Sequence, residues 1–182
     1  AYRSALFEKL AQVMGSYYGQ IAEGREQLRA CYVPSWEIHD PNAPATYTFG
    51  RDEAREELAR TLGERRGEER ARRRALVGPH ADRIEFFIDG RNVNSFASQG
   101  QQRSVVLAFK LAEVSLIQDI LHQKPVLLLD DVMSELDESR RRALVSFIAG
   151  DMQTFITTAN IDYFDSDLLG AARIVSLPRA VK

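Results

Sequence analysis

Length, composition and charge limit the classes of protein to which this chain can belong. Its 182 residues suffice for one domain and part of a second, and the 45% of apolar residues can form a buried core. A formal charge of -2 excludes a uniform attraction to nucleic acid, so any contact with DNA depends on local clusters among the 24 basic residues. No apolar run reaches the roughly 18 residues of a membrane span. The N-terminus also lacks the layout of a signal peptide, so we expect no membrane association.

Cysteine and histidine are too few to predict a disulfide or a zinc site. The single Cys31 cannot form an internal disulfide, and it fits the reducing cytoplasm, where we expect the protein to act. His39, His80 and His122 are scattered along the chain, whereas zinc ligands usually come in closely spaced pairs.

The first fifty residues predict a long helix followed by two strands. Apolar residues recur at steps of four and three, which places them on one face of a helix of about five turns: Tyr2, Leu6, Leu10, Val13, Tyr17 and Ile21. Residues 28–33 predict a strand that Pro34 ends, and residues 46–49 predict a second strand. A proline-rich stretch at residues 40–44 joins the two, so we expect a hairpin. The helical pattern begins at the first residue, which suggests a piece of a longer protein.

Arginine and glutamate dominate residues 51–74. Asp52 suits the N-cap of a helix over residues 52–62, and Gly63 suits its end. The interleaved charges favour a solvated helix face on which neighbours exchange ion pairs. The segment also suits a basic rim that contacts DNA phosphates, because it ends in Arg70, Arg72, Arg73 and Arg74. The sequence leaves both interpretations open.

From residue 77 onward, strands alternate with helices. A Gly-Pro turn precedes a strand over residues 84–88 and the turn Asp89-Gly90. The later elements follow in order: a helix over residues 101–121, a strand over 126–129, a helix that Asp137 caps and Ile148 ends, a strand over 155–157, a helix over 162–169 that Gly170 ends, and a strand over 174–177. This alternation predicts an α/β fold with a mostly parallel sheet, whose carboxyl edge is the usual place for ligands.

A polar loop with one glycine opens the helix over residues 101–121. Its sequence is Ser98-Gln99-Gly100-Gln101-Gln102-Arg103. Free backbone N–H groups and a dipole equivalent to about half a charge make such a helix start suitable for anions. Gly100 lets a phosphate approach the backbone because it has no Cβ, and Ser98 and Gln102 can add side-chain donors. The competing interpretation is an ordinary N-cap, in which Ser98 binds only its own helix.

Two adjacent carboxylates end the apolar strand over residues 126–129. Asp130 and Asp131 follow Val-Leu-Leu-Leu directly, and Ser134 and Asp137 come next in the run Ser-Glu-Leu-Asp. Neighbouring unpaired carboxylates repel each other, which favours a bound cation over two acids that merely end a strand. The sequence therefore predicts a cation-dependent site at this strand end.

Together, the Ser-x-Gly-Gln loop, the strand ending in Asp-Asp and the Ser-x-Leu-Asp run resemble the signature loop, Walker B strand and D-loop of ABC-type ATPases. The spelling Ser-Gln-Gly-Gln-Gln-Arg is most similar to the RecF family of recombination mediators, relatives of the SMC proteins. No Gly-x-x-x-x-Gly-Lys-Ser/Thr phosphate loop, or Walker A motif, occurs in the 182 residues. The resemblance therefore implies the C-terminal part of an ABC/SMC-type ATPase head. Residues 73–182 would belong to its lobe I, and residues 1–72 to a small, mostly helical lobe II.

The resemblance also implies a role for each matching residue. The signature loop, residues 98–103, would close over ATP held by the phosphate loop of a second molecule. Asp130 would hold Mg²⁺ through water. Asp131, where most ABC-type ATPases have glutamate, would orient or deprotonate the attacking water. Thr158 would sense the γ-phosphate, at the place where ABC transporters have a switch histidine. The D-loop would supply two further contacts to the nucleotide site, Ser134 and Asp137.

The function implied for the complete protein is ATP-dependent work on DNA in recombinational repair. It would form a homodimer on binding ATP and Mg²⁺, bind DNA at single-strand/double-strand junctions, and release it on slow hydrolysis. With RecR and RecO-type mediators it would help to load RecA at gaps. This chain alone would not hydrolyse ATP, because it lacks a phosphate loop. Two alternatives remain: another SMC-like head, which should show long coiled-coil heptads that residues 1–72 lack, or a non-enzymatic module that docks DNA or a partner protein.

Overall fold

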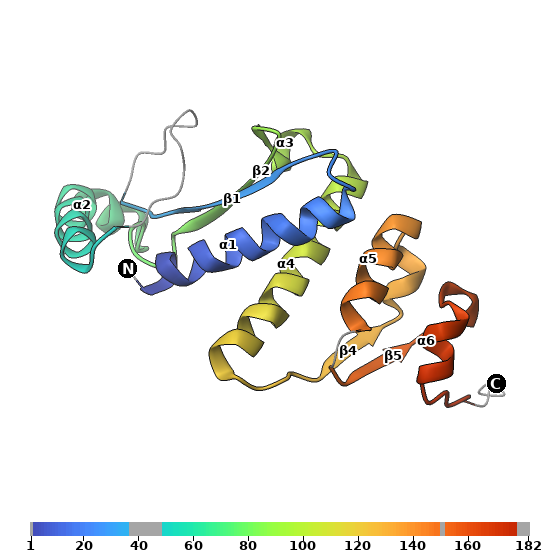
Figure 1. The fold of residues 1–182 in the computed structure, drawn as a ribbon. Helices are drawn as coiled ribbons and strands as arrows, with labels where there is room; N and C mark the ends of the chain where they lie inside the picture. Colours follow the sequence, from blue (N-terminus) through green and yellow to red (C-terminus); the bar gives the residue numbers. More distant parts are fainter. Residues whose placement is uncertain (1, 37–48, 150–151, 178–182) are drawn as a thin grey trace, which may run out of the picture. The chain divides into compact units, whose positions relative to one another are not determined.

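The computed structural model describes residues 2–36, 49–149 and 152–177. It divides into two compact units, one up to Leu121 and one from His122 onward. Figure 1 shows both units, coloured along the sequence from blue to red.

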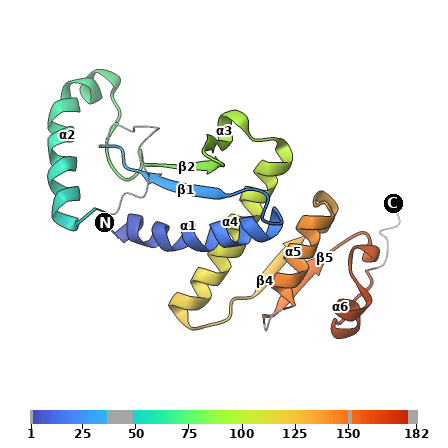
Figure 2. The same ribbon diagram turned by 45° about the horizontal axis from the view of Figure 1, so that its top comes forward.

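The first unit is built from two long helices and a small antiparallel sheet. Helix α1 (Tyr2–Ile21) packs against α4 (Gln99–Leu121) and against strand β1 (Leu28–Val33). Strand β1 pairs with β2 (Arg83–Ile88), which also pairs with the short β3 (Arg91–Asn92). The one-turn helix α3 (Val93–Phe96) leads into α4. Figure 2 shows α1 running alongside β1, with α4 crossing it.

The predicted first helix is confirmed, but its buried face agrees with the predicted one only at Ile21. The side chains of α1 that are buried lie at steps of three, four and seven: Ser4, Phe7, Met14, Tyr18 and Ile21. Tyr2 and Leu6, which were expected inside, are 85% and 48% exposed. Two apolar stripes compete on this helix, and the stripe that carries Tyr18 wins, since the Tyr18 hydroxyl finds a partner in Glu26 at 2.6 Å.

The strand predicted over residues 28–33 is confirmed and pairs with a distant segment, while most of the other arm of the expected hairpin lies outside the described residues. Leu28 pairs with Ile88 and Val33 with Arg83, so the paired residues are fifty to sixty positions apart in the sequence. The Asp89 backbone N–H donates to the Gln27 carbonyl at 3.0 Å, and the Gln27 N–H donates to the Asp89 carboxylate at 2.9 Å. This exchange closes the end of the ladder. Of the expected second strand, residues 46–48 lie outside the described residues, as does the expected loop at residues 40–44.

Helix α2 (Arg51–Arg72) is twice as long as predicted. It is capped by Gly50 rather than Asp52, and it continues through Gly63, where we expected it to end. A glycine inside a helix costs roughly 1 kcal/mol relative to alanine. Ion pairs between neighbouring turns, such as Arg60 to Glu57 at 2.6 Å and to Glu64 at 2.7 Å, help to offset this cost.

The second unit is a parallel strand pair with helical connections. Strands β4 (Leu127–Asp130) and β5 (Thr154–Thr157) pair in parallel, with α5 (Glu138–Ile148) between them in sequence. The buried apolar side chains of this unit are Met133, Leu136, Leu144 and Ile148. Two short 3-10 turns, η1 (Val132–Glu135) and η2 (Ile161–Tyr163), follow the two strands. The predicted strands and the helix that Asp137 caps are confirmed here.

Two predictions near the C-terminus are wrong. The helix expected over residues 162–169 is interrupted: η2 ends at Tyr163, and α6 (Ser166–Ala171) begins anew after Asp165, whose side chain accepts from the Leu168 N–H at 2.8 Å. Helix α6 also includes Gly170 instead of ending before it. Residues 174–177 form no strand, although their apolar side chains suit one.

The expected lobe boundary between residues 72 and 73 stays a prediction about the complete relatives. Within this chain, β1 lies before that boundary and its partner β2 after it. Across the described ranges, no helix has the length and apolar character needed to cross a membrane.

Candidate functional site

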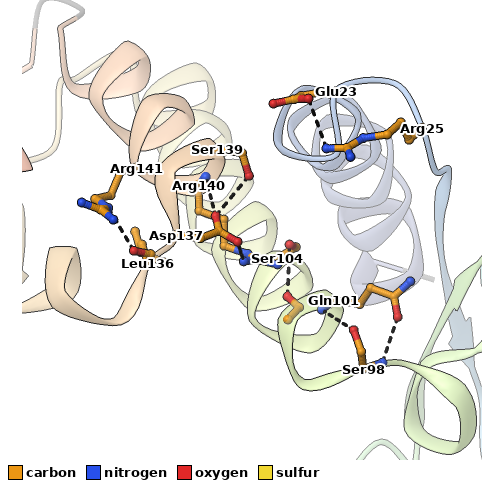
Figure 3. A network of polar contacts seen from close by, with 11 residues as sticks. Glu23, Arg25, Ser98, Gln101, Ser104, Leu136, Asp137, Ser139, Arg140 and Arg141 are labelled. Atoms are coloured by element: carbon orange, nitrogen blue, oxygen red, sulfur yellow. Dashed lines mark hydrogen bonds and ion pairs between the residues drawn. The ribbon is translucent and has the colours of Figure 1, made fainter.

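The loop that opens α4 forms a reciprocal capping box. The Ser98 Oγ accepts from the Gln101 backbone N–H at 3.2 Å, while the Ser98 N–H donates to the Gln101 side-chain oxygen at 2.8 Å. Figure 3 shows this exchange at the head of the helix. A hydroxyl that accepts one hydrogen bond still carries a hydrogen to donate. Ser98 therefore caps the helix, and its hydroxyl hydrogen can still be donated to a phosphate oxygen.

Gln101 ties the capping box to the first helix. Its Nε2 donates to the Glu26 carboxylate at 2.8 Å, and the other carboxylate oxygen of Glu26 accepts from the buried Tyr18 hydroxyl at 2.6 Å. Hydrogen bonds to a charged acceptor are about twice as strong as neutral ones. The loop is consequently held to α1 through side chains that are partly shielded from water.

Of the other signature-loop residues, some make local hydrogen bonds and some are exposed. The Gln102 Nε2 donates to the Ala97 carbonyl at 3.2 Å, and the Ser104 hydroxyl donates to the Gly100 carbonyl at 3.2 Å. Gln99 and Arg103 are exposed. The structure thus keeps Ser98 through Arg103 together at one helix start, with Gln101 and Gln102 already engaged by the protein.

The two carboxylates predicted at the end of β4 are held by residues from the neighbouring strand and the following turn. One oxygen of Asp130 accepts from the Thr157 hydroxyl at 2.5 Å, across the parallel pair that aligns these two residues. The Asp131 backbone N–H donates to the Thr157 carbonyl and hydroxyl oxygens, each at 3.1 Å. Both acids therefore lie at the carboxyl ends of parallel strands, the usual ligand edge of an α/β sheet.

Asp131 has a left-handed backbone, with φ 47° and ψ 24°. Few residues other than glycine adopt this region, although aspartate tolerates it better than most. The sharp turn brings Ser134 back, and its hydroxyl lies 2.9 Å from the Asp131 carbonyl oxygen and 3.1 Å from the Asp131 carboxylate. Ser134 thus fixes the orientation of the second acid.

Asp137 caps α5 and is surrounded by positive charge. Its carboxylate accepts from the Arg140 backbone N–H at 3.0 Å and from the Ser139 hydroxyl at 3.1 Å, and it forms an ion pair with the Arg140 guanidinium (Figure 3). Partial burial acts to raise the pKa of Asp137, but these hydrogen bonds and the charges of Arg140 and Arg141 lower it overall. Asp137 therefore stays ionised at neutral pH and fixes the start of α5.

Thr157, which the sequence did not single out, contacts the first acid, whereas the predicted Thr158 does not. The Thr158 hydroxyl donates to the Asn160 carbonyl at 2.9 Å and accepts from the Asn160 N–H at 3.2 Å, so it stabilises a local turn. Strand β5 ends at Thr157, so Thr158 lies beyond the strand. A register between β4 and β5 would have identified Thr157, but one sequence does not supply it.

The fit of this edge to Mg²⁺ follows from its donor set. Within residues 2–36, 49–149 and 152–177, no three histidine, cysteine or acidic side chains come together as metal ligands would. Mg²⁺ commonly needs only one or two carboxylates, with water and substrate phosphates completing its octahedron. Asp130 is exposed and uses one oxygen on Thr157, so it suits that mode of binding.

The Gly-Pro-His turn before β2 is fixed by a buried carboxylate. Asp82, whose side chain is 3% exposed, accepts from the Tyr32 hydroxyl and from the Ser35 backbone N–H at 2.8 Å. His80 lies on the surface, 3.4 Å from the Ala75 carbonyl oxygen. Burial and then the hydrogen bond to Asp82 raise the pKa of Tyr32 to about 12. These contacts account for the residues of the turn by their role in the fold.

Comparisons with known proteins agree with the motifs. No protein-family model matches the chain. A "DNA replication and repair protein RecF" of Lactobacillus delbrueckii subsp. bulgaricus is 43% identical over 158 residues, which are 86% of this chain and 40% of the relative. One from Rippkaea orientalis is 37% identical over 177 residues, or 96% of this chain and 44% of the relative. The chain spans about two fifths of the length of these curated relatives.

Solved structures match the fold. The "Structure of the recombination mediator protein RecF-ATP in RecFOR pathway" has a TM-score of 0.72 and 29% identity, covering 88% of this chain and 41% of that one. A second structure, with ATPrS in place of ATP in its description, matches equally well. The fold is that of the α/β head of an ABC/SMC-type ATPase. Within that class, the chain belongs to the RecF family.

Proposed function

We propose that the complete protein containing this chain is an ATP-dependent DNA-binding protein of recombinational repair. It binds ATP and Mg²⁺, forms a homodimer that traps the nucleotide, and binds DNA at single-strand/double-strand junctions. RecO and RecR-type mediators are its partners in helping to load RecA. The names of the relatives support the repair role, and the descriptions of the solved structures support ATP binding and the RecFOR pathway.

The acids at the end of β4 carry the proposal. Asp130, oriented by the Thr157 hydroxyl, would hold Mg²⁺ through water beside the phosphates of ATP. Bound there, the ion would neutralise charge on the phosphates. Asp131, oriented by Ser134, would accept a hydrogen bond from the attacking water and take its proton. Aspartate is one methylene shorter than the glutamate common at this position, which fits slow hydrolysis.

The signature loop would complete the nucleotide site of a second molecule. Ser98 offers its hydroxyl hydrogen, and Gly100 and the backbone N–H groups of the first turn suit close approach by a γ-phosphate. Gln101 would act as a positioning residue, because its side chain is held by Ser98 and Glu26. Gln99, Gln102 and Arg103 would line the same contact.

Further proposed roles follow from local geometry. Ser134 and Asp137 would belong to the nucleotide site as D-loop residues, with Asp137 acting through the start of α5 that it caps. Thr158 remains the proposed γ-phosphate sensor, although its hydroxyl bonds to Asn160 here. Steady hydrolysis would require the intact dimer, so this chain alone would be inactive.

The test separates the two acids in the complete protein. Asp131→Asn should preserve ATP binding and prolong the ATP-bound dimer, since only water activation is lost. Asp130→Asn should weaken Mg²⁺-dependent ATP binding, because a charged ligand of the ion is lost. Fluorescent-nucleotide titrations with and without Mg²⁺ measure the affinity, and light scattering measures dimer lifetime. Equal loss of nucleotide affinity in both variants would show that the assigned roles are wrong.

A further inference from the structure

The charges of α2 are separated along its length. Residues 51–64 carry three arginines against five acids, a formal charge of -2. Residues 65–74 carry six arginines against two glutamates, a formal charge of +4 within a chain whose total is -2. The C-terminal part of α2 and the two arginines that follow it therefore concentrate positive charge.

Three of these arginines follow one another near the end of α2. Arg66 and Arg70 are four residues apart and are neighbours on the helix surface, and Arg73 follows as the left-handed C-cap. All three are exposed, and we call them the arginine stripe. Figure 2 shows α2 beside the end of the β1–β2 pair. The one buried side chain of α2 is Thr61.

The acids within residues 65–74 are already engaged. Glu68 forms an ion pair with Arg72 at 2.9 Å. Glu69 turns back to accept from the backbone N–H groups of Leu76 at 2.7 Å and Val77 at 3.3 Å. Among the residues that the structure describes, none supplies an ion-pair partner to the stripe.

The helix dipole accounts for only part of this charge. Cations near a helix C-terminus are favourable within the last turn, which explains Arg70 and Arg72. Arg66 lies more than one turn before the end, and Arg74 follows the left-handed cap at Arg73. Their charge needs another explanation.

The chemistry of the surface favours a polyanion over a protein. Protein interfaces usually have an apolar, often aromatic, centre. Residues 64–74 contain no apolar side chain larger than that of Ala71. Guanidinium groups match phosphate oxygens bidentately, and most protein–DNA hydrogen bonds go to the backbone without reading sequence.

We infer that the arginine stripe binds the phosphate backbone of DNA. The inference rests on the proposed DNA role and names the surface that performs it. Its contacts are sequence-independent and depend on salt, because each neutralised phosphate releases a counterion. They come from one helix of one molecule, so they can be measured on this chain without ATP, whereas in the proposed function ATP-dependent dimerisation governs DNA binding by the complete protein.

The experiment uses the purified chain and a fluorescein-labelled 30-base-pair duplex of arbitrary sequence. Fluorescence anisotropy is measured from 50 to 200 mM salt. The test variant replaces the stripe by glutamine (R66Q/R70Q/R73Q). The control makes the same charge change in the acidic half of α2 (R51Q/R55Q/R60Q). Glutamine keeps good helix propensity, and circular dichroism checks the helix content of both.

The stripe variant should lose on the order of tenfold to a hundredfold in affinity, and its salt slope should fall by about 2 to 3. The control should stay within about twofold of the unchanged chain. Lysine at the three stripe positions keeps the charge, so it should retain most of the binding and the salt slope, even if the glutamine variant loses helix.

Four results would overturn the inference: no binding by the unchanged chain, no loss in the stripe variant, equal loss in the control, or loss of the salt slope with lysine. Binding of poly-L-glutamate without binding of the duplex would indicate an acidic protein partner instead. ATP-dependent dimerisation of the complete protein is measured without DNA. Its result does not depend on the outcomes of the binding experiment. The failure of the stripe is therefore distinguishable from the failure of the proposed ATPase cycle.

Discussion

Replacing Gln101 by alanine should detach the head of α4 from α1. Two hydrogen bonds are lost, one from the Ser98 N–H at 2.8 Å and one to the Glu26 carboxylate at 2.8 Å. A neutral hydrogen bond contributes about 1 kcal/mol net, and one to a charged group about 1.5–3 kcal/mol. Because Gln101 and Glu26 are partly exposed and alanine is the better helix former, we expect a loss of about 1–3 kcal/mol in the free energy of unfolding.

Urea unfolding of this chain measures the loss, with the fluorescence of its single tryptophan, Trp36, reporting on the first unit. Gln102→Ala is the matched control: its side chain makes one exposed bond to the Ala97 carbonyl, and we expect a loss of about 0.5 kcal/mol. A double-mutant cycle with Glu26→Ala should give a coupling of about 1 kcal/mol or more. A coupling near zero, or equal losses for Gln101 and Gln102, would refute the anchoring of the loop.

Two further predictions concern single hydroxyl groups. Tyr32 should ionise near pH 12 in an ultraviolet titration of the folded chain, and Tyr32→Phe should remove that phase. Because folding raises the pKa of Tyr32 above its ordinary 10, its contribution to stability is complete below pH 10 and is lost as the pH rises toward 12; an unchanged titration in the variant would count against the Asp82 contact. In the complete protein, Thr157→Val should weaken Mg²⁺-dependent ATP binding by freeing Asp130, and a larger effect from Thr158→Val would restore Thr158 as the residue nearest the chemistry.

The sequence predicted helix caps and the ends of strands correctly where a single segment determines them. The Ser98 cap, the acids ending β4 and the Asp137 cap each depend on residues within a few positions of one another. A strand that ends in acids and is followed by a capped helix fits few arrangements of secondary structure other than the observed one. These features account for the correct prediction of the α/β class.

Contacts between segments far apart in the sequence could not be predicted in the same way. Strand β1 pairs with β2, far along the chain, and nothing in either strand's composition encodes that pairing. Helix α1 carried two apolar stripes, and the choice between them depends on Glu26, outside the helix. Thr157 became visible only when the register placed it opposite Asp130. Helix α2 continues through Gly63, where the ion pair between Arg60 and Glu64 spans the glycine and helps to stabilise the helix.

The most direct test of the account is whether the signature loop acts between two molecules. Ser98→Arg in the complete protein would place a bulky cation where the nucleotide of the opposite molecule must seat, while loss of the cap costs only about 0.5–2 kcal/mol. Ser95→Arg, an exposed serine just before the loop, is the matched control. Light scattering should show that ATP doubles the mass of the unchanged protein and the control, whereas Ser98→Arg binds ATP and stays monomeric. A Ser98→Arg protein that still doubles its mass on adding ATP would show that Ser98 is only a helix cap.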